Sequence, residues 1–223
     1  MDALSKAARD GDDSGFSLVE MAVTLVIVSL LLGALTAPLA AQRQLQRRAQ
    51  AEQLLNDVRD ALYGYAASRV AADGGPHLPC PDIDGDGGED RSGGACTAPE
   101  GDLPWADLGL GRRDPWGDVL RYRVSVAFAD ANSGFALLDD GALRICAAAA
   151  CNAPLAQRAP AVFWSRGGDF ARLPTQADEM ENADGDDDFV SRPASADGAF
   201  DDIVVWLPGA LLTGRMIIAG RLP

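Results

Sequence analysis

The sequence is almost without two residue types on which protein chemistry often depends. Among its 223 residues there is one histidine, His77, and of the 19 basic residues all except Lys6 are arginines. A single histidine leaves little room for histidine-based catalysis or for a histidine-rich metal site. The formal net charge is -14. Such a chain is not suited to bind nucleic acid, because phosphate binding requires clustered basic residues.

Motifs of common catalytic sites are also missing. No G-x-S-x-G nucleophile elbow accompanies His77, and the glycine pair at residues 167–168 does not form a phosphate-binding loop. Pairs of acidic residues can act in glycosidases, but solvated carboxylates are far more common. We interpret the four tryptophans as packing residues. The sequence therefore predicts a protein that is not an enzyme.

What the sequence does contain is a long apolar run near its start. Residues 21–41 carry no charge and are uniformly apolar. As a helix they would extend about 31 Å, which matches the hydrocarbon core of a bilayer. A secretory signal peptide fits less well, since the first fifteen residues hold four acidic and two basic residues rather than a basic segment. We therefore expect a transmembrane helix.

Glu20 stands immediately before this run, in the segment Gly15-Phe16-Ser17-Leu18-Val19-Glu20. A carboxylate in an apolar span costs about 2.5–3.5 kcal/mol and so points to a function. The segment resembles the processing site of type IV pilins and of the pseudopilins of type II secretion. The resemblance implies that a prepilin peptidase cuts after Gly15, that the new N-terminal Phe16 is N-methylated, and that Glu20 is retained.

The resemblance also gives Glu20 a role in assembly. The free α-amine of Phe16 would be a cation near neutral pH. Glu20 of one subunit can pair with the amine of the next, which removes the cost of a lone carboxylate in lipid. Two features depart from the family, because the leader is net acidic and arginines follow the span on its outer side.

An amphipathic helix follows the span. Leu55, Val58, Leu62 and Tyr65 recur at helical spacing, opposite a face of Arg, Gln and Asp. We expect the helix to end at the Asp73-Gly74-Gly75-Pro76 segment. The chain then divides into a prepilin leader (1–15), a transmembrane half of the N-terminal helix (16–41), an amphipathic half (42–72) and a globular extracytoplasmic domain (73–223).

Four cysteines lie in the globular region. A domain outside the cytoplasm meets oxidising conditions, which favour disulfides. Four cysteines allow three pairings; we favour Cys80–Cys96 and Cys146–Cys151, because each closes a local loop. Zinc binding is the alternative, but neither pair forms a C-x-x-C knuckle.

Two acidic segments are candidate calcium loops. Asp82, Asp84 and Asp86 match the opening D-x-D-x-D-G of a calcium loop, in which alternate carboxylates converge on one cation. The closing glutamate is replaced by Gly93, and Asp90 is a substitute ligand. Asp184, Asp186 and Asp188 repeat the alternation without the glycine. The alternative for both segments is a solvated acidic loop; any bound calcium would be structural.

Strand patterns follow in the globular region. Asp118–Phe128 alternates, with Tyr122 and Phe128 on the same face. Residues 135–138 and 142–146 flank Asp139-Asp140-Gly141, a hairpin signal. The runs 161–165 and 203–207 also predict strands, and 209–219 predicts a helix or a strand. The expected fold is α+β, with a long N-terminal helix packed on a small antiparallel sheet, as in pilins.

These features together predict a structural subunit of a type IV pilus or type II secretion pseudopilus, a minor pilin or pseudopilin. The expected partners are a prepilin peptidase, the inner membrane and other pilin or pseudopilin subunits, with no nucleic acid. The protein would cross the inner membrane once, with its globular domain in the periplasm, and then enter the filament. The alternative is a membrane-anchored extracytoplasmic domain that binds calcium or is hydrolytic.

Overall fold

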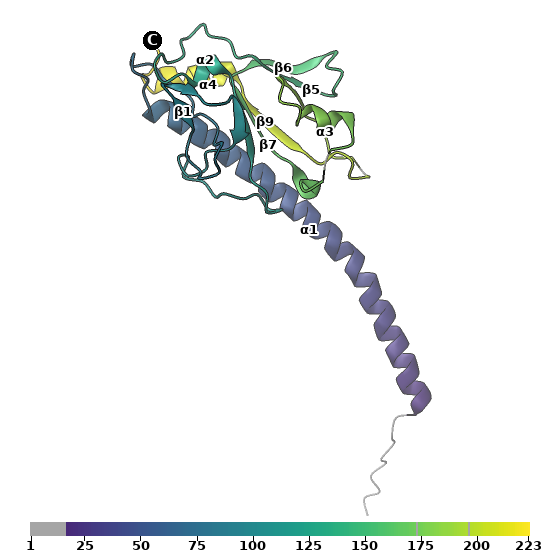
Figure 1. Ribbon diagram of the computed structural model, residues 1–223. Helices are drawn as coiled ribbons and strands as arrows, with labels where there is room; N and C mark the ends of the chain where they lie inside the picture. The colour runs from purple at the N-terminus through teal and green to yellow at the C-terminus, as the bar shows by residue number, and fades with distance from the viewer. Residues whose placement is uncertain (1–16, 173, 196) are drawn as a thin grey trace, which may run out of the picture. The chain divides into compact units, whose positions relative to one another are not determined.

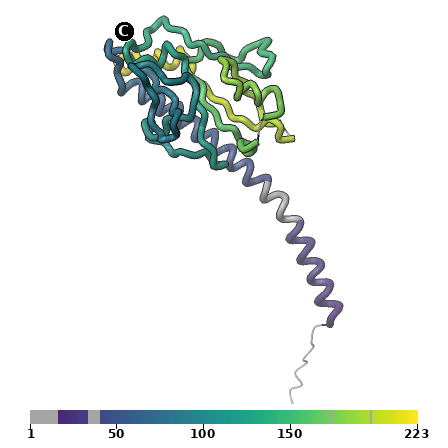
Figure 2. Tube along the Cα trace, viewed as in Figure 1, coloured from purple at the N-terminus to yellow at the C-terminus, as the bar shows by residue number. Residues whose placement is uncertain are grey.

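A computed structural model describes residues 17–172, 174–195 and 197–223 (Figure 1). For residues 34–40 it gives the backbone alone; Figure 2 draws them in grey with the residues left undescribed. The chain forms two compact units, Met1–Leu45 and Gln46–Pro223. Gly15, Phe16 and the whole predicted leader lie outside the described residues. The four-part division predicted from the sequence stays a prediction.

The elements of the described chain are few and short, apart from the first helix. The helices are α1 (Leu18–Ser68), α2 (Val126–Ala129), α3 (Ala177–Glu181) and α4 (Gly209–Ile218), with a 3-10 turn η1 (Gly167–Asp169). The strands are β1 (Arg91–Ser92), β2 (Ala95–Cys96), β3 (Glu100–Asp102), β4 (Arg121–Val124), β5 (Leu143–Cys146), β6 (Pro154–Ala159), β7 (Ala161–Ser165), β8 (Asp188–Val190) and β9 (Ile203–Leu207).

Helix α1 contributes residues to both units. In the second unit its apolar stripe is buried, with Leu55, Val58 and Leu62 all fully covered and Tyr65 nearly so. The helical spacing predicted this face, and the prediction is confirmed. Packing of such a stripe, rather than intrinsic propensity, supplies most of the stability of a helix.

The helix ends earlier than predicted, at Ser68 rather than near residue 72. The amides of Ala71 and Ala72 donate to the carbonyls of Gly75 and Ala131 instead of continuing the helix. Tertiary hydrogen bonds therefore fix the end of α1 before the Gly-Pro signal is reached.

Two sheets form the rest of the second unit. The main sheet has the order β3-β4-β7-β9 and is antiparallel throughout. The second has the order β6-β5-β8, in which β8 runs parallel to β5. A third pair, β1 and β2, forms a small hairpin.

Strand β7 shows how the layers are arranged. Successive side chains of a strand point to opposite faces. Ala161 and Phe163 belong to the core that α1 and α4 share with the main sheet. Val162 and Trp164 pack instead with residues of β5 and β8. The main sheet is thus covered by helices on one face and by the second sheet on the other (Figure 1), which explains why all five residues of β7 are buried.

Two strand predictions are wrong in part. The strand predicted over Asp118–Phe128 is confined to β4, and helix α2 follows it. Phe128 is buried, but Val126 is 67% exposed, so the alternating face does not continue. The Ser125 amide donates to the Pro160 carbonyl and the Phe128 amide to the Ser125 carbonyl, which turns the chain at this point.

The predicted hairpin across residues 135–146 is also wrong. Its second half is β5, but β5 pairs with β6 and β8, and residues 135–138 form no strand. Gly141 lies against the Ala159 carbonyl, where an added Cβ would be 2.1 Å from its oxygen. The glycine therefore serves a close backbone approach rather than a hairpin turn. The α+β class itself is confirmed, and the described residues form a four-stranded, a three-stranded and a two-stranded sheet in place of the one expected.

Candidate functional site

Glu20 lies in the first turn of α1, where its amide donates to the Ser17 hydroxyl at 3.2 Å. An acidic side chain at this position is favoured by the helix dipole. No ion pair to Glu20 is found among the described residues. Gly15 and Phe16, the residues of the predicted cleavage site, lie outside the described residues.

The helix surface on both sides of Glu20 in the sequence is apolar and exposed. Leu18 is 87% exposed and Leu30 69% exposed, and their large apolar neighbours up to Leu32 are at least half exposed. The two hydroxyls in this stretch are satisfied within the helix, since Thr24 donates to the Glu20 carbonyl and Ser29 to the Leu25 carbonyl. An apolar surface of this kind marks an interaction site.

Among the described residues, no helix is both long enough and apolar enough to cross a membrane. The span predicted at residues 21–41 includes 34–40, whose side chains lie outside the described residues.

Both predicted disulfides are present. Cys80 is bonded to Cys96 and Cys146 to Cys151, with Cα atoms 5.2 Å apart in each pair. Cys80 is fully buried in the core beneath α1, and its amide donates to the Glu89 carboxylate. The first disulfide therefore ties the acidic loop to the main core.

The first acidic loop brings three predicted ligands together. One carboxylate oxygen from each of Asp82, Asp84 and Asp86 lies within 4.8 Å of the others. Asp82 is buried and accepts from the amides of Gly85 and Gly87 at 2.7 and 2.8 Å. Carboxylate oxygens have about four lone-pair sites, so these bonds leave capacity for a cation.

Asp90, the predicted substitute ligand, has a different set of contacts. Its carboxylate accepts from the Ile83 amide at 2.6 Å and from the Asp84 amide at 3.3 Å. The Asp90 carboxylate thus stabilises the start of the loop. It does not belong to the group formed by Asp82, Asp84 and Asp86.

The second acidic loop forms a different cluster from the predicted one. Glu181, Asp186 and Asp188 have oxygens within 4.8 Å of one another, and Glu181 takes the place expected for Asp184. The Asp184 carboxylate accepts from the Asp186 amide. Asp188 already forms a two-bonded ion pair with Arg144, so much of the charge at this cluster is compensated.

A third acidic cluster was not predicted. Asp169, Glu179 and Asp201 come from η1, α3 and the segment before β9, and their oxygens lie within 4.8 Å of one another. Glu179 and the adjacent Asp202 are 7% and 6% exposed. They line a cavity of about 70 Å³ together with Asp169.

Burial and mutual repulsion raise the pKa of three carboxyls in this region, those of Asp202, Asp201 and Glu179. Burial raises the pKa of Asp202 to about 7, opposed by the hydrogen bond from Asn182 and reinforced by Glu179 and Asp201. Burial, with the nearby Asp169, raises the pKa of Asp201 to about 6. The pKa of Glu179 is also raised, chiefly by burial.

His77, the one histidine, is held in a buried network. It is 5% exposed, its Nδ1 lies 3.1 Å from an Arg91 Nη, and its ring meets that of Tyr65 edge to face. Burial, with the Arg91 charge, lowers the pKa of His77. Arg91 pairs with Glu89, which accepts a bond from the Tyr65 hydroxyl. This arrangement joins α1 to the disulfide loop and suits a structural role.

Comparison with known protein families gives a match near the N-terminus. Residues 12–36, which include Gly15, Phe16 and Glu20, match the family model described as the prokaryotic N-terminal methylation motif. No curated protein and no solved structure gave a match. The motif is the hallmark of prepilin-type proteins, the type IV pilins and pseudopilins. It supports a pilin-like role, and it implies processing by a prepilin peptidase, membrane anchoring and assembly with other pilin subunits.

Proposed function

We propose that this chain is a minor pilin or pseudopilin, a structural subunit of a type IV pilus or a type II secretion pseudopilus. It is processed after Gly15, held in the inner membrane by the first half of α1 with its globular domain in the periplasm, and assembled through that helix. The observation that carries the proposal is the methylation motif at residues 12–36. The matched residues include the exposed apolar helix surface from Leu18 to Leu32.

Assembly follows from the placement of Glu20. Its carboxylate lies in the first turn of α1 beside apolar side chains and has no ion-pair partner in the described part of the chain. In an apolar environment an unpaired carboxylate is costly. The N-terminal amine created by cleavage, on a neighbouring subunit, compensates it and sets the axial step between subunits.

The mass of the mature N-terminus tests the processing step. We expect protein purified from membranes to begin with N-methylated Phe16, as shown by mass spectrometry of the N-terminal peptide. An intact Met1, or cleavage close to Ala41, would show that the chain is a simple anchored or secreted protein instead.

The assembly step is tested by Glu20→Ala. The variant keeps the cleavage site, so we expect normal processing but a loss of about tenfold or more in filament-associated protein, because the pairing charge is gone. Glu52→Ala is the matched control, since Glu52 is an exposed acid on the same helix that pairs with Arg48. Normal incorporation of Glu20→Ala would contradict the proposed pairing.

We also propose that the first acidic loop binds a structural calcium ion through Asp82, Asp84 and Asp86. The close approach of their oxygens supports this site, and oxygen ligands are those that calcium prefers. Calcium should raise the thermal unfolding temperature relative to a chelator, and Asp84→Asn should abolish the difference. Asp184→Asn is the control, because Asp184 lies outside the carboxylate groups. Equal melting with calcium and chelator would exclude the site.

A further inference from the structure

A groove of about 420 Å³ lies between α1 and α4 in the second unit. Its lining includes Tyr63 and Ala67 from α1 and Arg215, Met216 and Ile218 from α4. The groove is predominantly apolar, and it uses residues that have no part in the N-terminal motif or the acidic loops.

The rim of the groove presents apolar side chains to solvent. Ile218 is 88% exposed and Leu211, on the same short helix, is 58% exposed. Gly64 opens the α1 side, since a Cβ at this residue would meet nothing within 4 Å. An exposed apolar patch beside a groove is typical of a docking surface.

Two polar side chains lie at the groove, one buried without a hydrogen-bond partner among the described residues and one more than half exposed with a long ion pair. The Tyr63 side chain is 4% exposed, and its hydroxyl has no hydrogen-bond partner among the described residues. Arg215 lies over the Tyr63 ring, 4.7 Å from its centre, and its nearest carboxylate, that of Asp60, is 3.8 Å away. A buried hydroxyl without a partner is unfavourable by about 1–3 kcal/mol. The groove therefore favours an occupant that joins an apolar side chain to a carboxylate.

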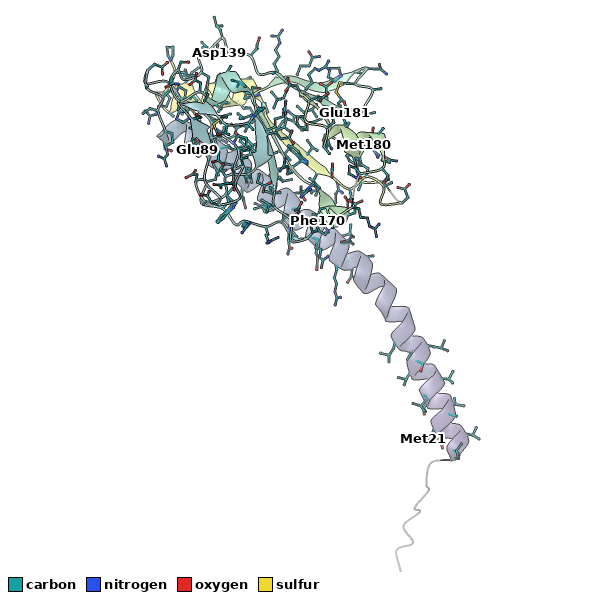
Figure 3. The ribbon with its side chains drawn as sticks, viewed as in Figure 1. Met21, Glu89, Asp139, Phe170, Met180 and Glu181 are labelled. Carbon is teal, nitrogen blue, oxygen red and sulfur yellow. A yellow bond between two sulfur atoms is a disulfide. The ribbon has the colours of Figure 1, made fainter. Side chains whose placement is uncertain are left out.

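The chain itself carries such a segment at the end of α3. Met180 is 52% exposed, and Glu181 follows it (Figure 3). Glu181 has no ion pair within the described chain, whereas its neighbours Asp187 and Asp188 pair with arginines. The carboxylate oxygens of Glu181, Asp186 and Asp188 lie within 4.8 Å of one another, so their like charges repel. A cation brought to this corner would relieve that repulsion.

We propose that the α1–α4 groove receives the α3 corner of a second copy of this chain, with Met180 in the apolar groove and Glu181 paired with Arg215. Methionine suits an irregular apolar groove because its side chain is unbranched and flexible. The groove and the corner are different surfaces, so the contact is heterologous and can repeat from copy to copy. The inference rests on the proposed function and adds the surface that joins the globular domains.

Cysteine cross-linking in the full-length chain tests the contact. All four native cysteines are in disulfides, so Ile218→Cys and Met180→Cys add the reactive thiols. Under mild oxidation in membranes, the double variant should give covalent dimers and a ladder of larger multimers on a non-reducing gel. Each single variant should not form the ladder. The matched control combines Ile218→Cys with Leu138→Cys, a residue 91% exposed and outside the proposed contact.

A charge exchange provides the second measurement. Arg215→Glu and Glu181→Arg should each reduce the ladder of the cross-linking pair by about tenfold, because like charges then meet. The two together should restore it. No ladder, an equal ladder in the Leu138 control, no restoration by the exchange, or a cross-link to a different protein would each overturn the contact. If one of these results is obtained although Phe16 is N-methylated and the chain enters filaments in the same cells, the proposed contact is wrong and the proposed function still holds.

Discussion

Asp202 is the residue whose chemistry depends most on the fold. It is 6% exposed and its pKa is raised to about 7, so the native state binds a proton that the unfolded chain releases near pH 4. A group with a raised pKa in the native state stabilises it fully below the unfolded pKa, and this contribution is lost as the pH rises through the native pKa. Asp201 and Glu179 act in the same direction.

We therefore predict that the protein becomes less stable as the pH rises from about 5 to 8. The unfolding temperature should fall by about 5 °C or more over this range. Asp202→Asn should flatten the dependence and raise the unfolding temperature at pH 8, since the amide oxygen can still accept the Asn182 bond. Asp57→Asn, an exposed carboxylate on α1, is the control. Circular dichroism gives the unfolding temperature of each variant as a function of pH. If Asp202→Asn and Asp57→Asn flatten the pH dependence equally, the assignment is contradicted.

Whether an acidic cluster could be predicted depended on how far apart its members lie in the sequence. Asp82, Asp84 and Asp86 converge as their spacing predicted, because a short loop with Gly85 and Gly87 places alternate carboxylates together. The cluster of Asp169, Glu179 and Asp201 joins three separate segments. Spacing along the chain carried no signal for it, since only the tertiary arrangement of η1, α3 and the segment before β9 brings the carboxyls together.

At the scale of the element, α1 has two halves of different character. Up to Leu32 its large apolar residues are exposed, whereas from Ala51 onward one stripe enters the core. The periodic half was predictable because one face meets one sheet. The uniformly apolar half shows no such one-sided pattern, and its large side chains up to Leu32 are exposed.

A truncated chain of residues 46–223 should therefore fold alone. It retains the whole buried stripe, so we expect a cooperative thermal transition within a few degrees of that of the full-length chain. A shorter chain beginning at residue 60 loses Leu55 and Val58, which are fully buried. Its stability should fall by several kcal/mol, as for large cavities in a core. Absence of a cooperative transition in the longer fragment would show that the two units fold together.

Strands were predictable where the whole strand has the same degree of burial. β7 and β9 are nearly covered on both faces, and their short apolar runs marked them. β4 ends early because Ser125 bonds to Pro160, and β8 was missed because an acidic segment, paired through Arg144, supplies its first residue. Both outcomes depend on tertiary partners that local alternation does not encode.

At the scale of the whole molecule, the acidic charge is concentrated in two regions. Residues 73–102 hold eight acidic residues and one arginine, and residues 178–202 hold ten and one. Part of this charge is neutralised by arginines that are distant in the sequence. On β4, Arg123 pairs with Asp187 and Arg121 pairs with Asp102. The sequence alone showed where the acidic charge lies, but it did not show which arginines neutralise it.

The two ends of the second unit meet in one core. Leu212 and Met216 of α4 are buried with the stripe of α1, and Arg221 donates to the Ala67 carbonyl beside the end of that helix. The ribosome makes the α1 stripe well before it makes α4. Until α4 has been synthesised, the stripe lacks part of its cover. The core of the second unit can therefore close only after α4 has been made.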